Sequence, residues 1–174
     1  MNLLKKISHV NYALLWVLIS IFSRLIPHPF DASASISLAL WAPLFFNRYY
    51  GLAISVTSLL LADLSLHLLA GYPTFGTWSL FTYTAIVALA LFNRSHGKHM
   101  LLITIFGALG FWLWTNFGTW LMTNDLYPKT WLGLLDCYIA GLPFLKNSLI
   151  GSLAYSLILK YCYQYRAKKR LITT

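Results

Sequence analysis

Long apolar runs separated by short polar connections dominate this chain, and each run is long enough for a helix. A helix needs about 20 apolar residues to cross the hydrocarbon core of a membrane. Six runs meet or approach that length and are predicted to span it. The predicted spans are residues 10–26, 33–46, 50–69, 77–92, 100–121 and 145–165.

A seventh apolar run, residues 130–144, is too short to span and is predicted to form a separate outer helix that ends at Pro143. The second span is also short and carries Pro43 inside it. The pattern therefore predicts an all-α membrane protein. It has one domain, residues 1–174, with six transmembrane helices and a short outer helix before the last span.

Composition and charge agree with this class. The chain is 59% hydrophobic and 10% charged, whereas about a quarter of the residues in a soluble domain are charged. Lys and Arg are enriched in cytoplasmic loops, so their positions predict the orientation. With both termini inside, ten of the 13 lie inside, and only Arg24, Lys129 and Lys146 lie outside. This bias explains the net charge of +9 without a nucleic acid partner, and it places the basic tail against membrane lipid.

The same orientation gathers the acidic residues in the outer half. An ionisable group at the centre of a membrane helix costs about 2.5–3.5 kcal/mol and normally faces a partner or a wet cavity. Asp63 and His67 are four residues apart and share one helix face. They could bind a ligand, or they could form an internal hydrogen bond that joins two helices. Arg24 is the natural partner for Asp31 or Asp63, and such a pair could be purely structural.

Tryptophan and tyrosine residues also concentrate on the outer side, where an interfacial aromatic belt is the simplest interpretation. Mixed with Asn116, Asp136 and Lys146 beside proline breaks, they equally suit a small-molecule pocket. Cys137 could ligate a metal as a thiolate, although a packed free thiol is the simpler interpretation. The sequence has no catalytic, nucleotide-binding or zinc motif, so we expect neither an enzyme nor a bound cofactor.

Several segments together carry a family resemblance: RLIPHPF, LLLADLSLHLL, TNFGTWL and YPKTWLGLLDCYIAGLPFLKN, followed by a basic last helix. They resemble a family of small bacterial inner-membrane proteins related to the substrate-binding S components of energy-coupling factor (ECF) vitamin transporters. The resemblance implies a multi-pass inner-membrane protein that binds a vitamin-like molecule in its outer half. It also implies a possible coupling subunit and ATPases as partners.

Two features depart from the S-component pattern. The connection 70–78 lacks the cysteine that ligates cobalt in some cobalamin-transporting members. The first span lacks the small-residue face used for docking to the coupling subunit. The nearest such pairs are Ser35/Ala39 and Ser58/Ala62, which could equally serve internal packing.

From these observations we expect a membrane uptake protein, with cobalamin as the leading candidate ligand. Arg24 and His28 would meet an anionic or amide group, and Asp63 and His67 would orient the ligand. The remaining predicted site residues are Tyr72, Trp112, Asn116, Asp136, Tyr138 and Asn147. Two alternatives stay open: a non-transporting scaffold of the MreD type, and a membrane enzyme acting on a lipid with Asp63 and His67 as its base.

Overall fold

The computed structural model describes residues 3–26, 32–92, 99–123 and 125–172, and this part of the chain is entirely helical in its regular structure. The all-α expectation is therefore confirmed. The helices are α1 (Leu3–Leu25), α2 (Ser35–Phe45), α3 (Arg48–Ala70), α4 (Ser79–Phe92), α5 (Met100–Met122), α6 (Trp131–Ala140) and α7 (Leu142–Ile172).

Three of the described helices are long and apolar enough to cross a membrane: Arg48–Ala70, Met100–Met122 and Leu142–Lys168. They correspond to α3, α5 and the greater part of α7. The other apolar stretches of the described residues, in α1, α2, α4 and α6, have 10–17 residues. The protein thus has the character of a membrane protein, as its composition predicts.

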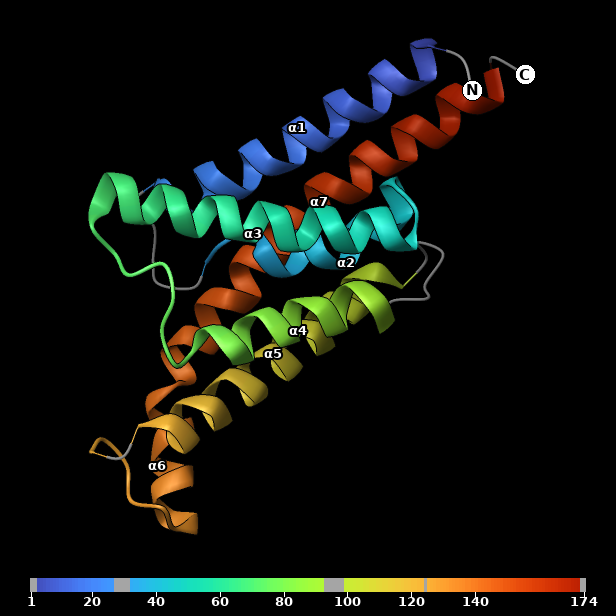
Figure 1. The fold of residues 1–174 in the computed structure, drawn as a ribbon. Helices are drawn as coiled ribbons and strands as arrows, with labels where there is room; N and C mark the ends of the chain where they lie inside the picture. Colours follow the sequence, from blue (N-terminus) through green and yellow to red (C-terminus); the bar gives the residue numbers. More distant parts are fainter. Residues whose placement is uncertain (1–2, 27–31, 93–98, 124, 173–174) are drawn as a thin grey trace.

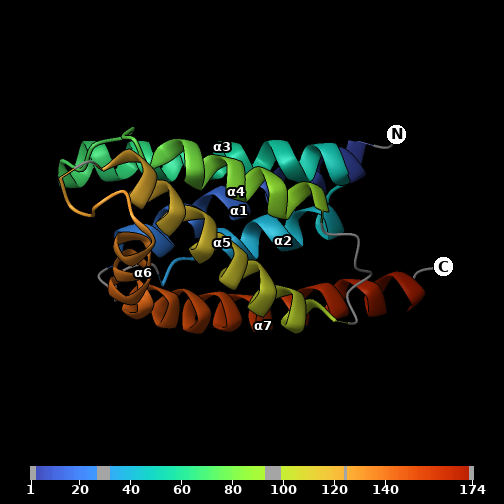
Figure 2. The ribbon, with the colours of Figure 1, turned by 90° about the horizontal axis from the view of Figure 1, so that it is seen from below.

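The short helix α2 forms the centre of the bundle, and α1, α3, α4, α5 and α7 all contact it. Eight of its 11 residues are buried, including the fully buried Trp41. A helix that is apolar on every side belongs inside a protein. Figures 1 and 2 show α3 and α4 on one side of α2 and α7 on the other.

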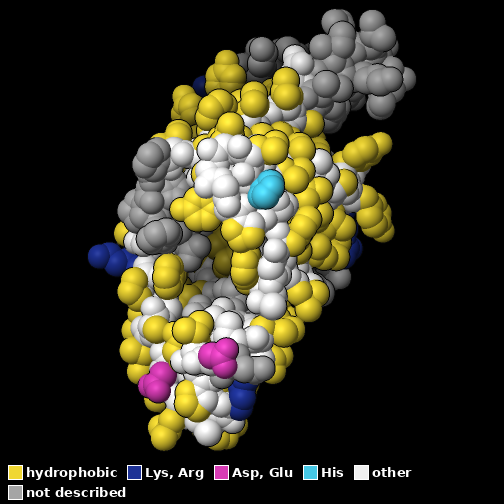
Figure 3. All heavy atoms as spheres, turned by 60° about the vertical axis from the view of Figure 1, so that its left-hand side comes forward, with side chains coloured by type: hydrophobic (Ala, Val, Ile, Leu, Met, Phe, Trp, Pro, Cys, Tyr) yellow, Lys and Arg dark blue, Asp and Glu magenta, His cyan; other side chains and the backbone are white. Residues whose placement is uncertain are grey.

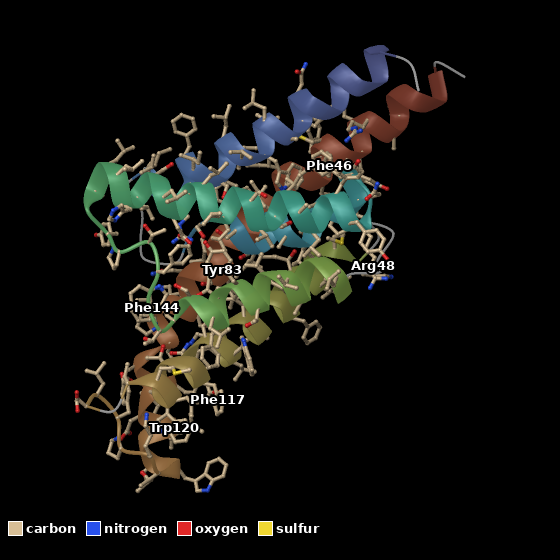
Figure 4. The ribbon with its side chains drawn as sticks, viewed as in Figure 1. Phe46, Arg48, Tyr83, Phe117, Trp120 and Phe144 are labelled. Atoms are coloured by element: carbon tan, nitrogen blue, oxygen red, sulfur yellow. The ribbon has the colours of Figure 1, made fainter. Side chains whose placement is uncertain are left out.

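The two termini lie at one end of the bundle, and α6 lies at the opposite end (Figure 1). Arg48, at the start of α3, lies toward the end that holds the termini, while Phe117 and Trp120 of α5 lie near α6 (Figure 4). We refer to the end with α6 and the α3–α4 connection as the α6 end.

Local signals in the sequence explain where several helices begin and end. The Asn47 side chain accepts a hydrogen bond from the Tyr50 backbone N–H at 2.9 Å and caps the start of α3. Gly71 ends α3 in the left-handed conformation, with φ of 71°. The Thr130 hydroxyl caps α6 by accepting from the Gly133 N–H at 3.1 Å.

The prediction for Pro143 was wrong. The short helix α6 already ends at Ala140, and Pro143 lies in the first turn of α7. Proline fits there because the first N–H groups of a helix have no partner within the helix, and its fixed φ suits the helical conformation. The last helix consequently begins three residues earlier than the apolar pattern suggests.

A buried network of polar side chains joins α2, α5 and α7. The Trp41 indole N–H donates to the Ser156 hydroxyl at 3.1 Å, and that hydroxyl lies 2.8 Å from the Thr104 hydroxyl. The Ser37 hydroxyl donates to the Ser152 carbonyl at 2.6 Å. Hydrogen bonds of this kind hold membrane helices together where water cannot satisfy the same groups.

Candidate ligand-binding site

A cavity of about 310 Å³ lies toward the α6 end, beside the start of α2. Its walls come from helices far apart in the sequence. The lining residues are Arg24, Ser33, Ser35, Ile36, Leu59, Thr82, Phe111, Trp112, Thr115, Asn116, Thr119, Tyr127, Cys137, Ala140, Gly141, Phe144 and Ser148. Seen from this end, the surface is hollowed between the part formed by α6 and the rest of the bundle (Figure 3).

The lining combines aromatic walls with many hydroxyl groups. Phe111, Trp112 and Phe144 supply apolar surface, and Asn116 adds one amide. Serine, threonine and tyrosine contribute seven hydroxyl-bearing side chains, and Arg24 is the one charged side chain among the described residues that line the cavity. Apolar walls with a few placed polar groups are the usual construction of a small-molecule site.

Arg24 reaches the cavity from the end of α1 and is held by an ion pair. Its Nη2 atom lies 2.8 Å from Asp63 Oδ1 on α3. The Tyr83 hydroxyl on α4 donates to Asp63 Oδ2 at 2.8 Å, and Figure 4 shows Tyr83 between α3 and α4. Both carboxylate oxygens of Asp63 are therefore occupied by protein groups. The Asp63 side chain is 12% exposed, against 26% for Arg24, so the arginine is the partner that faces the cavity.

The junction of α6 and α7 forms the opposite wall and is tied to α5. The Trp112 indole N–H donates to the Gly141 carbonyl at 2.8 Å, and the Asn116 Nδ2 donates to the Trp112 carbonyl at 2.9 Å. A Cβ atom on Gly141 would lie 2.3 Å from Asn116 Oδ1. A larger residue here would therefore displace the Asn116 side chain, and the glycine lets α6 lie close against α5.

Cys137 lies in this wall as a buried thiol. Its Sγ donates to the Asn116 carbonyl at 3.4 Å. Burial raises the pKa of the Cys137 thiol above its ordinary value, which keeps it protonated near neutral pH. Among the described residues, no group of three His, Cys, Asp or Glu side chains could hold a metal ion together. A metal role for Cys137 stays a prediction.

Of the predicted site residues, Arg24, Trp112 and Asn116 line the cavity. Asp63 lies behind Arg24. Tyr138 supports the wall, because its hydroxyl donates to the Leu113 carbonyl at 3.1 Å and its ring centroid lies 5.2 Å from that of Trp112.

The other five predicted residues, His28, His67, Tyr72, Asp136 and Asn147, lie away from the cavity lining or outside the described part. His67 Nδ1 lies 2.9 Å from the Tyr72 carbonyl oxygen, and both side chains are exposed at the end of α3. Asp136 is exposed, and Asn147 is half-buried on α7. His28 lies outside the described residues.

Sequence reasoning did not single out the hydroxyl residues. Thr115 and Thr119 of α5 lie on the same helix face as Trp112 and Asn116, because residues three and four apart are neighbours on a helix. That spacing is the signal that could have found them. The remaining hydroxyl groups of the lining come from other segments of the chain, and only the fold brings them to the cavity. They belong to Ser33, Ser35, Thr82, Tyr127 and Ser148.

The fold and the cavity define the class as an all-helical protein with helices long and apolar enough to cross a membrane and with a cavity of mixed polar and apolar lining toward the α6 end. The particular family follows from sequence comparison. Residues 5–172 match the family model described as "Family of unknown function (DUF6580)", so the chain belongs to this family. No curated protein and no solved structure matches the chain.

Proposed function

We propose that this protein binds a small vitamin-like molecule in the cavity near the α6 end and moves it across a bacterial inner membrane, as the S components of ECF transporters do. The observation that carries the proposal is the cavity, since a scaffold held together only by internal pairs has no need for a space of about 310 Å³ lined by both polar and aromatic side chains. Transport would proceed by reorientation or gating, without covalent chemistry.

The proposed topology has six crossings with both termini in the cytoplasm. Two observations support it. The termini lie at one end of the bundle (Figure 1), as an even number of crossings requires. Lys and Arg are concentrated in the segments assigned to that end, which suits a cytoplasmic face.

The central helix accounts for the position of the cavity in this topology. With 11 residues, α2 is about 16 Å long, roughly half the hydrocarbon thickness of about 30 Å. The cavity adjoins its first residues, Ser35 and Ile36. A half-length helix in the middle of a membrane bundle leaves space that side chains and a ligand can share.

The size of the cavity bears on which ligand is proposed. Small-molecule pockets range from about 300 to 1,000 Å³, and this one, at about 310 Å³, lies at the lower limit. Cobalamin, the leading candidate from the sequence, carries a large macrocycle and a nucleotide loop. It would require the cavity to open considerably. The volume favours a smaller vitamin-like compound.

Any ATP-driven step would require a second chain, because the sequence contains no nucleotide-binding motif. A coupling subunit with ATPases is accordingly the proposed partner, together with the surrounding lipid.

Native mass spectrometry of the protein purified gently in detergent tests the binding function. We expect a co-purified small molecule in the wild-type protein and its loss in Ala140→Phe, which fills the cavity from an exposed lining position. Ala154→Phe, at an exposed position of α7 outside the lining, is the matched control and should retain the compound. An empty wild-type protein that also gains no thermal stability from a vitamin panel would overturn the proposal.

A further inference from the structure

Resting on the binding function proposed above, we infer the chemical class of the ligand: a small organic monocarboxylate whose carboxylate meets Arg24 and whose body lies against Phe111, Trp112 and Phe144. The charge of the lining, the geometry of the ion pair and the aromatic walls support this choice independently.

The charge of the lining excludes cations and favours an anion. Among the described residues that line the cavity, Arg24 is cationic and none is acidic. The described acidic residues lie elsewhere. Asp63 is behind Arg24, and Asp125 and Asp136 are exposed and outside the lining. A positively charged ligand would be desolvated beside a guanidinium, and none of the described lining residues offers a carboxylate to compensate it.

The ion pair leaves Arg24 able to bind a second carboxylate. Its contact with Asp63 is made by Nη2. A guanidinium carries five N–H donors on three nitrogens, arranged as a planar fork that matches a carboxylate. The contact of Asp63 with this fork is made through Oδ1, while its Oδ2 accepts from the Tyr83 hydroxyl. The pair thus holds the arginine in place at the cavity lining, with N–H donors beyond the one that contacts Asp63.

The start of α2 adds partial positive charge to the same part of the cavity. This helix begins without a side-chain cap, and Ser33, Ser35 and Ile36 line the cavity around its first turn. Unpaired N–H groups at a helix N-terminus favour anions, with an effect equivalent to about half an elementary charge. The partial positive charge at the start of α2 therefore adds to the preference for an anionic ligand that Arg24 creates.

The rest of the lining describes the body of the ligand. Aromatic side chains from α5 and α7 offer flat apolar faces, and Trp112 has its indole N–H occupied by the Gly141 carbonyl, so it presents its ring. Asn116 donates through Nδ2 to the Trp112 carbonyl, which leaves its Oδ1 as an acceptor. A compact, partly aromatic acid with one N–H or O–H donor satisfies these groups.

Matched pairs of acids and their uncharged amides test the inference. We would titrate benzoate against benzamide, nicotinate against nicotinamide, and indole-3-acetate against indole-3-acetamide. The protein would be held in phosphatidylcholine nanodiscs, which supply no anionic lipid as a competitor. At least one acid should bind, measured by calorimetry and thermal shift. Its amide should bind at least about tenfold more weakly, as expected for the loss of a charged hydrogen bond.

Two variants assign the preference to Arg24. Asp63→Asn should bind the acid as tightly as wild type or more tightly, because the guanidinium loses its competing anion. Arg24→Gln combined with Asp63→Asn replaces the ion pair by neutral amides that can hydrogen-bond to each other. It should remain folded but lose the preference for the acid, again by at least about tenfold.

Failure of the inference can be distinguished from failure of the proposed function. Amides that bind as tightly as acids, a complete absence of acid binding, or an acid preference that survives in the double variant would each overturn the carboxylate assignment. If wild-type protein nevertheless carries a neutral compound that Ala140→Phe excludes, the binding function stands. If native mass spectrometry finds no co-purified compound and the titrations find no binding, both the carboxylate assignment and the proposed binding function are overturned.

Discussion

Arg24 on α1 and Asp63 on α3, separated by 39 positions in the sequence, lie with Nη2 and Oδ1 2.8 Å apart. The same carboxylate accepts a hydrogen bond from Tyr83 on α4 at 2.8 Å, so one acidic side chain joins three helices. The ion pair therefore joins helices and also orients its two members. Asp63 faces the protein interior, and Arg24 faces the cavity.

Breaking this ion pair from one side should destabilise the ligand-free protein. We expect Arg24→Leu and Asp63→Leu each to cost about 2 kcal/mol of the free energy of unfolding, since each leaves a partly buried charge unpaired. The double variant should cost clearly less than the sum of the two. Unfolding in detergent with increasing denaturant measures the three values, and strictly additive effects would contradict an ion pair that matters for stability.

The close approach of α2 and α3 at Gly51 should not tolerate a methyl group. A Cβ at this position would lie 2.8 Å from the backbone carbonyl carbon of Ala42 and 2.8 Å from the nitrogen of Pro43. Backbone atoms cannot move aside easily, so Gly51→Ala should reduce the free energy of unfolding by about 1–3 kcal/mol.

Gly110→Ala is the matched control for Gly51→Ala, because a Cβ there meets no atom within 4 Å. It lies inside α5, where alanine stabilises a helix by roughly 0.5–1 kcal/mol relative to glycine. The same unfolding measurement should therefore show the two substitutions moving stability in opposite directions. Equal effects would mean that the α2–α3 contact is looser than described here.

Removing the Ser156 hydroxyl should be more costly than removing an ordinary serine hydroxyl. Ser156→Ala would take away the acceptor of the Trp41 indole N–H and the partner of the Thr104 hydroxyl. The Trp41 indole N–H would be left unsatisfied, whereas the Thr104 hydroxyl keeps its bond to the Met100 carbonyl at 2.8 Å. Since one unsatisfied buried polar group costs about 1–3 kcal/mol, we expect a loss of about 2 kcal/mol. In Ser65→Ala, the lost hydroxyl bonds only the Leu61 carbonyl of its own helix, and the thermal midpoint should change little.

The two cysteines should react with a small maleimide at different rates. Cys137 is 2% exposed and Cys162 is exposed. The raised pKa of Cys137 further reduces its thiolate fraction at neutral pH, and its reaction should accelerate at a higher pH than that of an ordinary cysteine. Mass spectrometry of single-cysteine variants would separate the rates. Comparable labelling of both thiols at neutral pH would show that the α6 wall opens readily.

The apolar pattern of the sequence was sufficient to predict most helices. The bounds of α2, α3, α4 and α5 differ from the predicted ranges by at most two residues, because long apolar runs flanked by polar or helix-ending residues leave few alternatives. α1 begins earlier than predicted, at Leu3, since the apolar pattern marks where a helix is buried and not where it ends. Pro143 misled the interpretation because proline is compatible with either side of a helix boundary.

Which residues line the cavity could be learned only from the tertiary structure. The sequence indicated that Arg24 would pair with an acid, but not which one, and it gave no reason to single out Tyr83. Trp112 and Asn116 belong to the lining, whereas Asp136 and Asn147 do not, although all four looked equally suitable in the sequence.

Hydrophobic periodicity and the cost of charge in a membrane therefore determined the class, the helices and the end of the molecule where the polarity gathers. Only the packing of α1, α2, α5, α6 and α7 decided which polar groups face a common space. The physical reason is that burial of an apolar run depends on the run itself, while a cavity depends on distances between side chains that the chain brings together from remote positions.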